Sequence, residues 1–193
     1  MISAVVLAAG KSSRMGQPKM VLPWGHTTVI GKVITTLMDA GLNNLHVVTG
    51  DNQISLENGL KGFPIEFVFN PDFAEGEMIS SVQIGLKSLL VKSEAALIVL
   101  GDQPQIETRV VQAIMDSYLA TRGEIVVPSY QMHRGHPWLV DKSLWSEIFE
   151  LKQTDTMQNF LRQHQEKINY ISVNTPSIIQ DIDTPEEYKL FSP

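Results

Sequence analysis

The chain has 193 residues, no cysteine and a net charge of −6, with 43% apolar and 19% charged residues. This length and balance indicate a globular protein with one buried core rather than a disordered or fibrous chain. The absence of cysteine excludes disulfides, thiolate metal sites, iron–sulfur clusters and cysteine nucleophiles, and the negative charge argues against a protein that holds nucleic acid through its bulk field.

Apolar runs are short throughout the chain. The longest, residues 4–9 and 95–100, have six residues each, whereas a helix that spans a bilayer needs about 20. The N-terminus carries no positively charged segment, and its apolar stretch is interrupted at Gly10 and Lys11, so it does not resemble a secretory signal. We therefore expect a cytoplasmic protein with no membrane partner.

The coarse pattern alternates strands with helices. Apolar, β-branched runs predict buried strands, and apolar residues at helical spacing predict helices. In chain order we expect strand 2–8, helix 27–40, strands 45–49 and 65–69, a helix from about residue 78, strand 95–100, helix 106–118, strands 125–128 and 138–140, helices 143–151 and 155–164, and strand 168–173. This order predicts a mainly parallel sheet with helices on both faces, in which ligands bind at the carboxyl ends of the strands.

The first candidate for chemistry is the long loop that follows the first strand. It reads LAAGKSSRMGQPK over residues 7–19 and carries Lys11, Arg14 and Lys19 among glycines and serines. Backbone amides of such a loop can surround an anion, and the cations add full positive charge, which is typical of a polyphosphate site. The loop matches neither a Walker A motif nor the GxGxxG fingerprint. The alternative is a flexible surface loop with solvated cations.

Two aspartates are candidate metal ligands. Asp102 lies in GDQP (residues 101–104), directly after a buried strand, and Asp183 lies in DIDTP (residues 181–185). Carboxylate oxygens suit Mg²⁺ held jointly with phosphates, so pairing of the two aspartates would complete a divalent site. The alternatives are that Asp102 caps a turn or a helix, and that Asp183 or Thr184 is the N-cap of a C-terminal helix.

Serine and histidine supply weaker candidates. Ser80 and Ser81 open the helix expected from about Met78, where serine is first of all a cap. His136 lies in RGHP (residues 134–137), and a lone histidine beside glycine and proline is more often a turn residue than a catalyst. The other histidines show no metal-ligand spacing, and the three tryptophans are expected to pack in the core or at its rim.

These segments together resemble one family, the molybdenum cofactor nucleotidyltransferases, and they are most similar to its cytidylyltransferase branch. The resemblance runs in matching order from residue 1 to about residue 190. The segments that carry it are LAAGKSSRMGQPKMVLPWG (7–25), NPDFAEGEMISSVQIGL (70–86), GDQP (101–104), RGHP (134–137) and DIDTPEEY (181–188).

The resemblance implies a fold and an activity. The fold is a single NTP-transferase domain over residues 1–193, three-layered and Rossmann-like, with a mainly parallel α/β sheet of the glycosyltransferase-A-like type. The activity is transfer of a nucleoside monophosphate to the phosphate of molybdenum cofactor or molybdopterin, with Mg²⁺ as cofactor and pyrophosphate as leaving group. CTP is the favoured donor, because guanylyltransferases of the wider family usually show LAGG where this chain has LAAG, and the methyl group of Ala9 would restrict a purine. A molybdoenzyme or its chaperone is the implied protein partner, and no nucleic acid is expected.

The resemblance also assigns roles to residues. Arg14, Lys19 and Asp102 form the catalytic set, with Arg14 and Lys19 on the triphosphate. Asp102 and Asp183 hold the metal, and Ser81 helps to fix the base. The full nucleotide-binding set is Leu7, Ala8, Ala9, Gly10, Arg14, Lys19, Ser81 and Asp102, and the acceptor side is Arg134, Gly135 and His136.

One segment departs from the family pattern. Members of the cytidylyltransferase branch commonly carry a GDxGAR-like segment before the last strand, whereas this chain reads LKQTDTMQNFLRQH over residues 151–164 and keeps only Asp155. The departure concerns the acceptor more than the nucleotide. The alternatives are therefore guanylyl transfer, transfer to another phosphorylated small molecule, and a nucleotide-binding module without turnover; the two aspartates beside Arg14 and Lys19 argue against the last.

Overall fold

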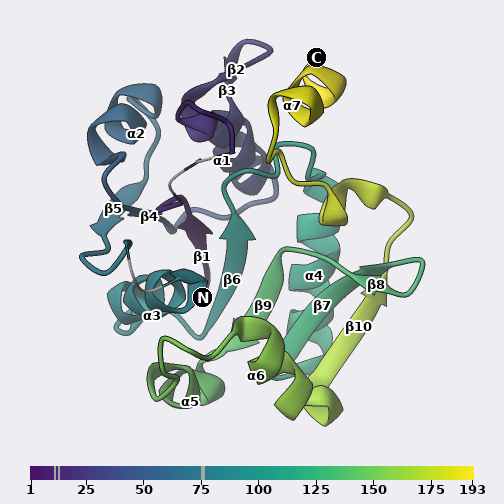
Figure 1. The fold of residues 1–193 in the computed structure, drawn as a ribbon. Coiled ribbons are helices and arrows are strands. Elements are labelled where there is room, and N and C mark those ends of the chain that lie inside the picture. Colours follow the sequence, from purple (N-terminus) through teal and green to yellow (C-terminus); the bar gives the residue numbers. More distant parts are fainter. Residues whose placement is uncertain (11, 13, 75–76) are drawn as a thin grey trace.

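An eight-stranded sheet forms the centre of the computed structural model, which describes residues 1–10, 12, 14–74 and 77–193 (Figure 1). Its strands are β1 (Ile2–Leu7), β4 (Leu45–Thr49), β5 (Glu66–Phe69), β6 (Ala95–Leu100), β7 (Ile125–Tyr130), β8 (His133–Arg134), β9 (Trp138–Asp141) and β10 (Ile168–Ser172). Across the sheet the order is β10-β7-β9-β6-β1-β4-β5, and β8 pairs with β7.

Most strand pairs are parallel. β1 pairs in parallel with β4 and β6, β4 with β5, and β7 with β10, whereas β9 is antiparallel to both β6 and β7. The chain between β7 and β9 is a short hairpin through β8, too short for the crossover of a dozen or more residues that a parallel connection requires. The predicted α/β fold with a mainly parallel sheet is confirmed, and the short connection explains its antiparallel strand.

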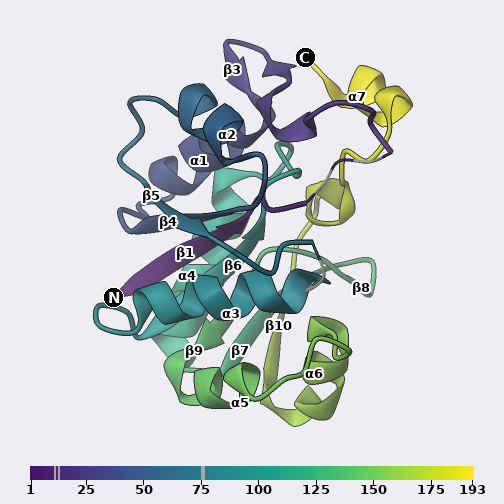
Figure 2. The same ribbon diagram turned by 60° about the vertical axis from the view of Figure 1, so that its left-hand side comes forward.

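Helices cover both faces of the sheet (Figure 2). The first core cluster packs α1 (Val29–Asp39), α2 (Gln53–Gly59) and α4 (Thr108–Thr121) on one face. The second packs α3 (Glu77–Leu89), α5 (Trp145–Phe149) and α6 (Met157–Gln163) on the other. α7 (Pro185–Phe191) lies outside these layers, beside the hairpin of β2 (Pro23–Trp24) and β3 (Thr27–Thr28), where Ile182 is buried with Trp24 and Val29. The described residues also form short 3₁₀ helices, η1 (Lys19–Val21), η2 (Lys142–Leu144), η3 (Gln165–Lys167) and η4 (Pro176–Ile179).

The position of α3 depends on one glycine. A Cβ atom on Gly85 would lie 2.3 Å from Cγ1 of Val5 in β1 and 3.1 Å from Cγ2 of Val48 in β4, so the helix can pack this close only without a side chain there. Ser81 lies one helical turn before Gly85, on the same face of the helix. The close packing therefore brings Ser81 to the carboxyl end of β1.

The short elements were not expected from the sequence, among them α2, β8 and the β2–β3 hairpin, and α1, α4, α5 and α6 each start two residues later than expected. α1 begins at Val29 because Thr28 is its N-cap, with the Thr28 hydroxyl accepting a hydrogen bond from the Gly31 backbone N–H at 3.1 Å. α2 has only Leu56 buried within its seven residues, so it shows no apolar stripe. The two-residue strand β8 is exposed on both residues and carries no apolar pattern. In the described part of the chain no helix is long and apolar enough to cross a membrane.

Candidate active site

A pocket of about 460 Å³ opens at the carboxyl ends of β1 and β6. Parallel strands end together at this edge, and Leu7 of β1 is in register with Leu100 of β6. Eight residues that the sequence marked as site candidates line the pocket: Leu7, Ala9, Gly10, Arg14, Lys19, Ser81, Asp102 and Asp183. The sheet edge therefore gathers segments that are up to 176 positions apart in numbering, from residue 7 to residue 183.

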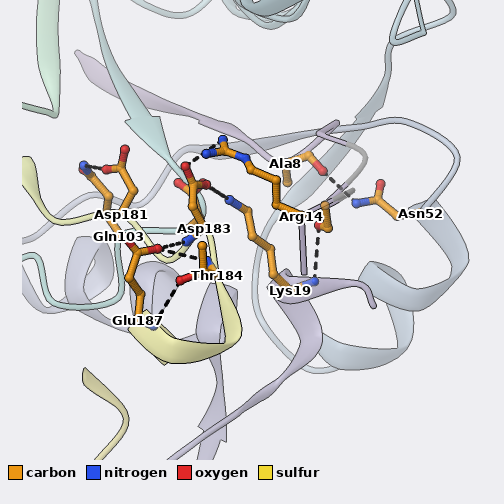
Figure 3. Close-up of polar contacts among 11 residues, drawn as sticks. Ala8, Arg14, Lys19, Asn52, Gln103, Asp181, Asp183, Thr184 and Glu187 are labelled. Atoms are coloured by element: carbon orange, nitrogen blue, oxygen red, sulfur yellow. Dashed lines mark hydrogen bonds and ion pairs between the residues drawn. The ribbon is translucent and has the colours of Figure 1, made fainter. Parts of the chain in front are cut away.

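Lys19 joins the two predicted metal ligands. Its Nζ atom lies 2.5 Å from Oδ2 of Asp102. The same atom lies 2.7 Å from Oδ1 of Asp183 (Figure 3). The two carboxylate oxygens can therefore be no further apart than these two short distances combined. Asp102 and Asp183 therefore meet, as a paired divalent site requires, and neither is the cap that the alternative readings offered.

The expected phosphate ligands are engaged with these carboxylates. Lys19 opens η1 and its side chain is only 10% exposed, whereas Arg14, 2.7 Å from Oδ2 of Asp183, is 71% exposed. Lys19 is thus a buried residue that bridges two acids, not the solvated loop cation of the alternative reading. Lys11, the third cation of the loop, lies outside the described residues.

The ion pairs shift the ionisation of the site. Burial of Lys19 disfavours its charged form, but the carboxylates of Asp102 and Asp183 outweigh burial and raise the pKa of Lys19. Partial burial of Asp183 likewise opposes ionisation, yet Lys19 and Arg14 hold the pKa of this carboxyl below its ordinary value. Lysine and aspartate thus keep their opposite charges in the pocket.

The segment that carries Asp183 is held at both ends. The Ile182 backbone N–H donates to the carbonyl of Asp102 at 3.2 Å. On the other side, Thr184 is the N-cap of α7 in a capping box, in which Glu187 Oε2 accepts from the backbone N–H groups of Asp183 and Thr184 at 2.9 Å each. Capping is therefore the role of Thr184, and the Asp183 side chain is left for the pocket.

Asp181 is a third carboxylate at the pocket, and no role for it was predicted from the sequence. Its Oδ1 accepts a hydrogen bond from Nε2 of the buried Gln103, which follows Asp102 in the chain. Partial burial of the carboxyl group and the negative charges of Asp102 and Asp183 raise the pKa of Asp181, although the Gln103 hydrogen bond works in the opposite direction. The sequence signal was the apolar Ile182 between Asp181 and Asp183, because alternate residues of an extended segment face the same side. Ile182 is buried in the structure, as that pattern predicts.

The end of β1 is tied to neighbouring strands by polar contacts. The Ala8 backbone N–H donates to Val48 at 2.9 Å, and the Ala8 carbonyl accepts from Nδ2 of Asn52 at 2.8 Å. Ala8 itself does not line the pocket; its backbone is used within the fold. Farther along the loop, the Lys19 backbone N–H donates to Oγ of Ser12 at 3.3 Å, which fixes the start of η1.

Ser81 is 5% exposed and lines the pocket from α3. Its Oγ accepts a hydrogen bond from Nδ2 of Asn70 at 3.0 Å. Asn70 follows β5 and is 1% exposed. Asn70 was not among the predicted site residues, although a polar residue directly after a predicted strand of such a sheet is a signal for the site.

Comparison with known proteins identifies the family. A family model described as a MobA-like NTP transferase domain matches residues 4–168. The chain belongs to this family. The predicted resemblance is thus confirmed at the level of the family and of its activity class, nucleotidyl transfer.

Individual relatives cover nearly the whole chain. The molybdenum cofactor cytidylyltransferase of Escherichia coli strain K12 is 29% identical over 188 residues, which are 97% of this chain and 93% of the relative. The nicotine blue oxidoreductase of Paenarthrobacter nicotinovorans is 28% identical, with 98% and 96% covered. Among solved structures, Rv0371c of Mycobacterium tuberculosis H37Rv in complex with manganese is 25% identical with a TM-score of 0.83, covering 99% of this chain and 97% of that one.

The donor set of this MobA-like transferase fits a divalent cation. The point between Asp102 and Asp183 already receives a positive charge, the Lys19 ammonium, and carboxylate oxygens are hard ligands. Within the described ranges no group of three or more histidine, aspartate or glutamate side chains is arranged to hold a metal. A cation at this point would therefore have two protein carboxylates and would complete its ligands from elsewhere.

The RGHP segment of this MobA-like transferase lies outside the pocket. A Cβ on Gly135 would come 2.3 Å from the carbonyl of Ile178, and the His136 backbone N–H donates to the same carbonyl at 2.8 Å. The His136 ring stacks on Trp138 with centroids 4.0 Å apart. Burial lowers the pKa of His136 to about 4, and its Nδ1 has no hydrogen-bond partner among the described residues.

Arg134, the first residue of the predicted acceptor side, is exposed. Arg134 lies at the surface with its guanidinium 5.2 Å from the ring centre of Tyr170. Asp155, the residue retained from the departing segment, accepts a hydrogen bond from the Lys152 backbone N–H at 2.7 Å within its own turn, and it does not line the pocket. The structure therefore brings the nucleotide-side and metal-side candidates together and leaves Arg134, Gly135, His136 and Asp155 apart from them.

Proposed function

We propose that this protein is a molybdenum cofactor cytidylyltransferase, which transfers CMP from CTP to the phosphate of a molybdopterin-type acceptor. The observation that carries the proposal is the convergence of Asp102, Lys19 and Asp183 at the carboxyl edge of the sheet. Arg14 and Ser81 line the same pocket, so cations, carboxylates and a hydroxyl face one volume of nucleotide size. The likeness to the Escherichia coli cytidylyltransferase and the methyl group of Ala9 support the choice of CTP.

The proposed work of Arg14 and Lys19 is to bind the triphosphate. Arg14 is exposed at the rim, so its guanidinium can turn toward phosphate oxygens without repacking the core. Lys19 lies deeper and contacts both acids. In the nucleotide complex it would lie between the carboxylates and the phosphates, where its charge offsets both.

Asp102 and Asp183 are the proposed ligands of a Mg²⁺ ion shared with the phosphates. When bound, that ion would supply charge neutralisation for the phosphate oxygens and the leaving pyrophosphate. The manganese complex of the Mycobacterium tuberculosis relative supports a divalent ion in this family. Asp181, with its raised pKa, is a neighbour of this pair rather than a third ligand.

The reaction itself needs positioning more than acid–base chemistry. An oxygen of the acceptor phosphate attacks the α-phosphorus, a new P–O bond forms, and the bond to the β-phosphate oxygen breaks with release of pyrophosphate. A phosphate monoester is largely ionised near neutral pH, so the acceptor needs no general base. His136 does not line the pocket, which is consistent with a reaction that uses no histidine base.

The acceptor side is proposed to be formed by RGHP. Gly135 and His136 fix the course of the backbone beside η4, and Arg134 presents an exposed cation to an anionic acceptor. The family match ends at residue 168, and we propose that the following residues belong to the same functional domain, 1–193, because they deliver Asp183. A molybdoenzyme or its chaperone is the proposed recipient of the product.

Redox chemistry is the rival that the relatives raise, since one of them is named an oxidoreductase. The pocket favours nucleotidyl transfer, because its charged groups suit phosphates and a divalent ion, and the chain carries no GxGxxG fingerprint.

Pyrophosphate release tests the proposal. The protein is incubated with each of the four nucleoside triphosphates and Mg²⁺, with and without molybdenum cofactor. Release with CTP that requires the cofactor is the expected result. Release with GTP instead of CTP would show that the donor is GTP. Release that requires another phosphorylated acceptor would show that the acceptor is not molybdenum cofactor. Nucleotide binding without pyrophosphate release under any condition would identify a nucleotide-binding module without turnover.

A further inference from the structure

We propose that Asn70 is a positioning residue that sets base specificity: it holds the Ser81 hydroxyl as a hydrogen-bond donor toward the pocket, so that the pocket selects an acceptor atom on the base. The inference rests on the proposed function, in which Ser81 contacts the base. It adds a residue, Asn70, that does not line the pocket and acts only through Ser81.

The orientation of the Asn70 amide follows from its neighbours. Its Oδ1 accepts a hydrogen bond from the backbone N–H of Asp72 at 3.0 Å, and a backbone N–H can only donate. The Nδ2 atom must therefore face the other way, where it lies 2.9 Å from Oγ of Ser80 and 3.0 Å from Oγ of Ser81. The two protons on this nitrogen are used by the two hydroxyl groups.

This contact decides what Ser81 can offer a ligand. Because its oxygen accepts from Asn70, its proton is not directed at Asn70. In the part of the chain that the structure describes, no acceptor takes that proton, although Ser81 is only 5% exposed. A buried hydroxyl donor without an acceptor is unfavourable, and an acceptor on a bound ligand would remove that penalty.

Asn70, which orients the Ser81 hydroxyl, is itself fixed by its backbone. The Asn70 backbone N–H donates to the carbonyl of Thr49 at the end of β4, at 2.9 Å. Asn70 thus connects the ends of β4 and β5 with the first turns of α3, whose approach to the sheet depends on Gly85. A hydroxyl fixed by such a network can select between bases, because its direction does not adapt to the ligand.

Cytosine suits a fixed donor. Its edge carries two adjacent acceptors, the O2 carbonyl and the unprotonated N3, whereas uracil keeps O2 but has a donor at N3. If the Ser81 hydroxyl faced the N3–H group of uracil, two donors would oppose each other without an acceptor, and affinity would fall. The Asn70–Ser81 contact therefore supplies a polar reason for selecting cytosine, independent of the shape argument from Ala9.

The decisive variant is Asn70→Asp, which keeps the shape and reverses the polarity. A carboxylate at this position still accepts from the Asp72 N–H but can only accept from the hydroxyls, so it draws the Ser81 proton away from the pocket. We expect affinity for CTP with Mg²⁺ to fall by about tenfold or more, while affinity for inorganic tripolyphosphate with Mg²⁺ changes by less than about twofold. Binding is measured by isothermal titration calorimetry, and folding by melting temperature.

The chain offers a matched control. Asn44 donates from Nδ2 to Oγ of Ser3 at 2.8 Å, before β4 and at the opposite end of the sheet from the pocket. Asn44→Asp makes the same chemical change in a similar contact. It should leave the affinities for both ligands unchanged.

A double-variant comparison tests whether Asn70 acts through Ser81. Ser81→Ala alone should weaken CTP binding, and combining it with Asn70→Asp should weaken binding no further, because the second residue has nothing left to orient. Wild-type CTP affinity in Asn70→Asp, or additive losses in the double variant, would overturn the inference. Should Asn70→Asp not fold, Asn70→Ala must still weaken CTP relative to tripolyphosphate.

The outcomes also separate the inference from the proposed function. If Ser81→Ala weakens CTP binding and Asn70→Asp does not, only the role of Asn70 is wrong. If the wild type binds CTP no more tightly than tripolyphosphate, or Ser81→Ala binds CTP normally, the proposed base contact is wrong and the inference is overturned with it.

Discussion

The Nζ atom of Lys19 lies 2.5 Å from Oδ2 of Asp102, although the two residues are 83 positions apart in the sequence. The same nitrogen lies 2.7 Å from Asp183, so an ammonium group occupies the point between the two proposed metal ligands. A divalent ion and Lys19 would compete for the same oxygens. A triphosphate that draws Lys19 toward its own oxygens should therefore favour metal binding.

Removal of the Lys19 ammonium should expose this competition. Lys19→Met leaves Asp102 and Asp183 facing each other without a counter-ion, so we expect affinity for Mn²⁺ in the absence of nucleotide to rise by about tenfold. Electron paramagnetic resonance of free Mn²⁺ measures it. The exposed Lys61, changed to Met, is the control. Equal Mn²⁺ affinity in wild type and Lys19→Met would contradict competition between the metal ion and the Lys19 ammonium for the same carboxylate oxygens.

Neutralising either carboxylate should remove turnover while preserving shape. Asp102→Asn and Asp183→Asn each keep the side-chain volume but lose the charge, and we expect the rate of pyrophosphate release to fall by roughly 10² or more. Asp116→Asn, at an exposed position of α4, should be fully active. Wild-type turnover in Asp102→Asn would remove that residue from the site.

Arg14 should matter for nucleotide and not for the fold. Its side chain is 71% exposed, and exposed ion pairs contribute only about 0–1 kcal/mol, so Arg14→Ala should leave the melting temperature nearly unchanged. Affinity for CTP should fall about tenfold, because a guanidinium contact to phosphate is lost. A large drop in melting temperature with unchanged CTP affinity would instead assign Arg14 to the fold.

Ala9 should influence the size of the accepted base. It lines the pocket and is 6% exposed, so its methyl group takes space next to the bound nucleotide. We expect the wild type to prefer CTP over GTP by about tenfold and Ala9→Gly to reduce this preference. Competition between equal concentrations of the two nucleotides measures the ratio. An unchanged ratio in the variant would leave the Asn70–Ser81 contact as the source of selectivity.

His136 should make the free energy of unfolding depend on pH. Burial lowers its pKa from 6.5 to about 4, so between these values the unfolded chain binds more protons than the folded one. Stability should therefore fall as pH drops from 6.5 to about 4, by roughly 2–4 kcal/mol from this residue. His136→Gln should flatten that part of a urea-denaturation series, and His26→Gln, at an exposed position, should not. A slope that survives in His136→Gln would contradict the assignment.

The strand pattern was readable from sequence because buried parallel strands are continuous apolar runs. β4 and β6 match their expected ranges, and α2 was missed because a short helix with one buried residue has no periodic signal. The rule that parallel strands end at one edge placed Asp102 at the pocket. Asp183 reaches it differently, through the segment after η4, where the Ile182 backbone N–H donates to the carbonyl of Asp102. The partner of Lys19 did not follow, since sequence shows which cations a loop carries but not which of several anions they contact.

Polar contacts inside the pocket wall were the least predictable part. Asn70 donates to Ser81 and Gln103 donates to Asp181. Such contacts depend on hydrogen-bond directions that only coordinates supply. RGHP on the acceptor side stays a prediction, and the structure adds that Gly135 and His136 pack closely against η4. A motif that marks a family can therefore hold the backbone together even where its residue types suggest a ligand.

Asp183 comes after the last strand of the sheet, in the segment that leads into α7. A chain cut before Asp181 would keep every strand of the described sheet and Lys19, but only one of the two acids that Lys19 bridges. The charge balance of the pocket therefore depends on a segment outside the sheet, which is anchored where the Tyr188 hydroxyl donates to the carbonyl of Pro23.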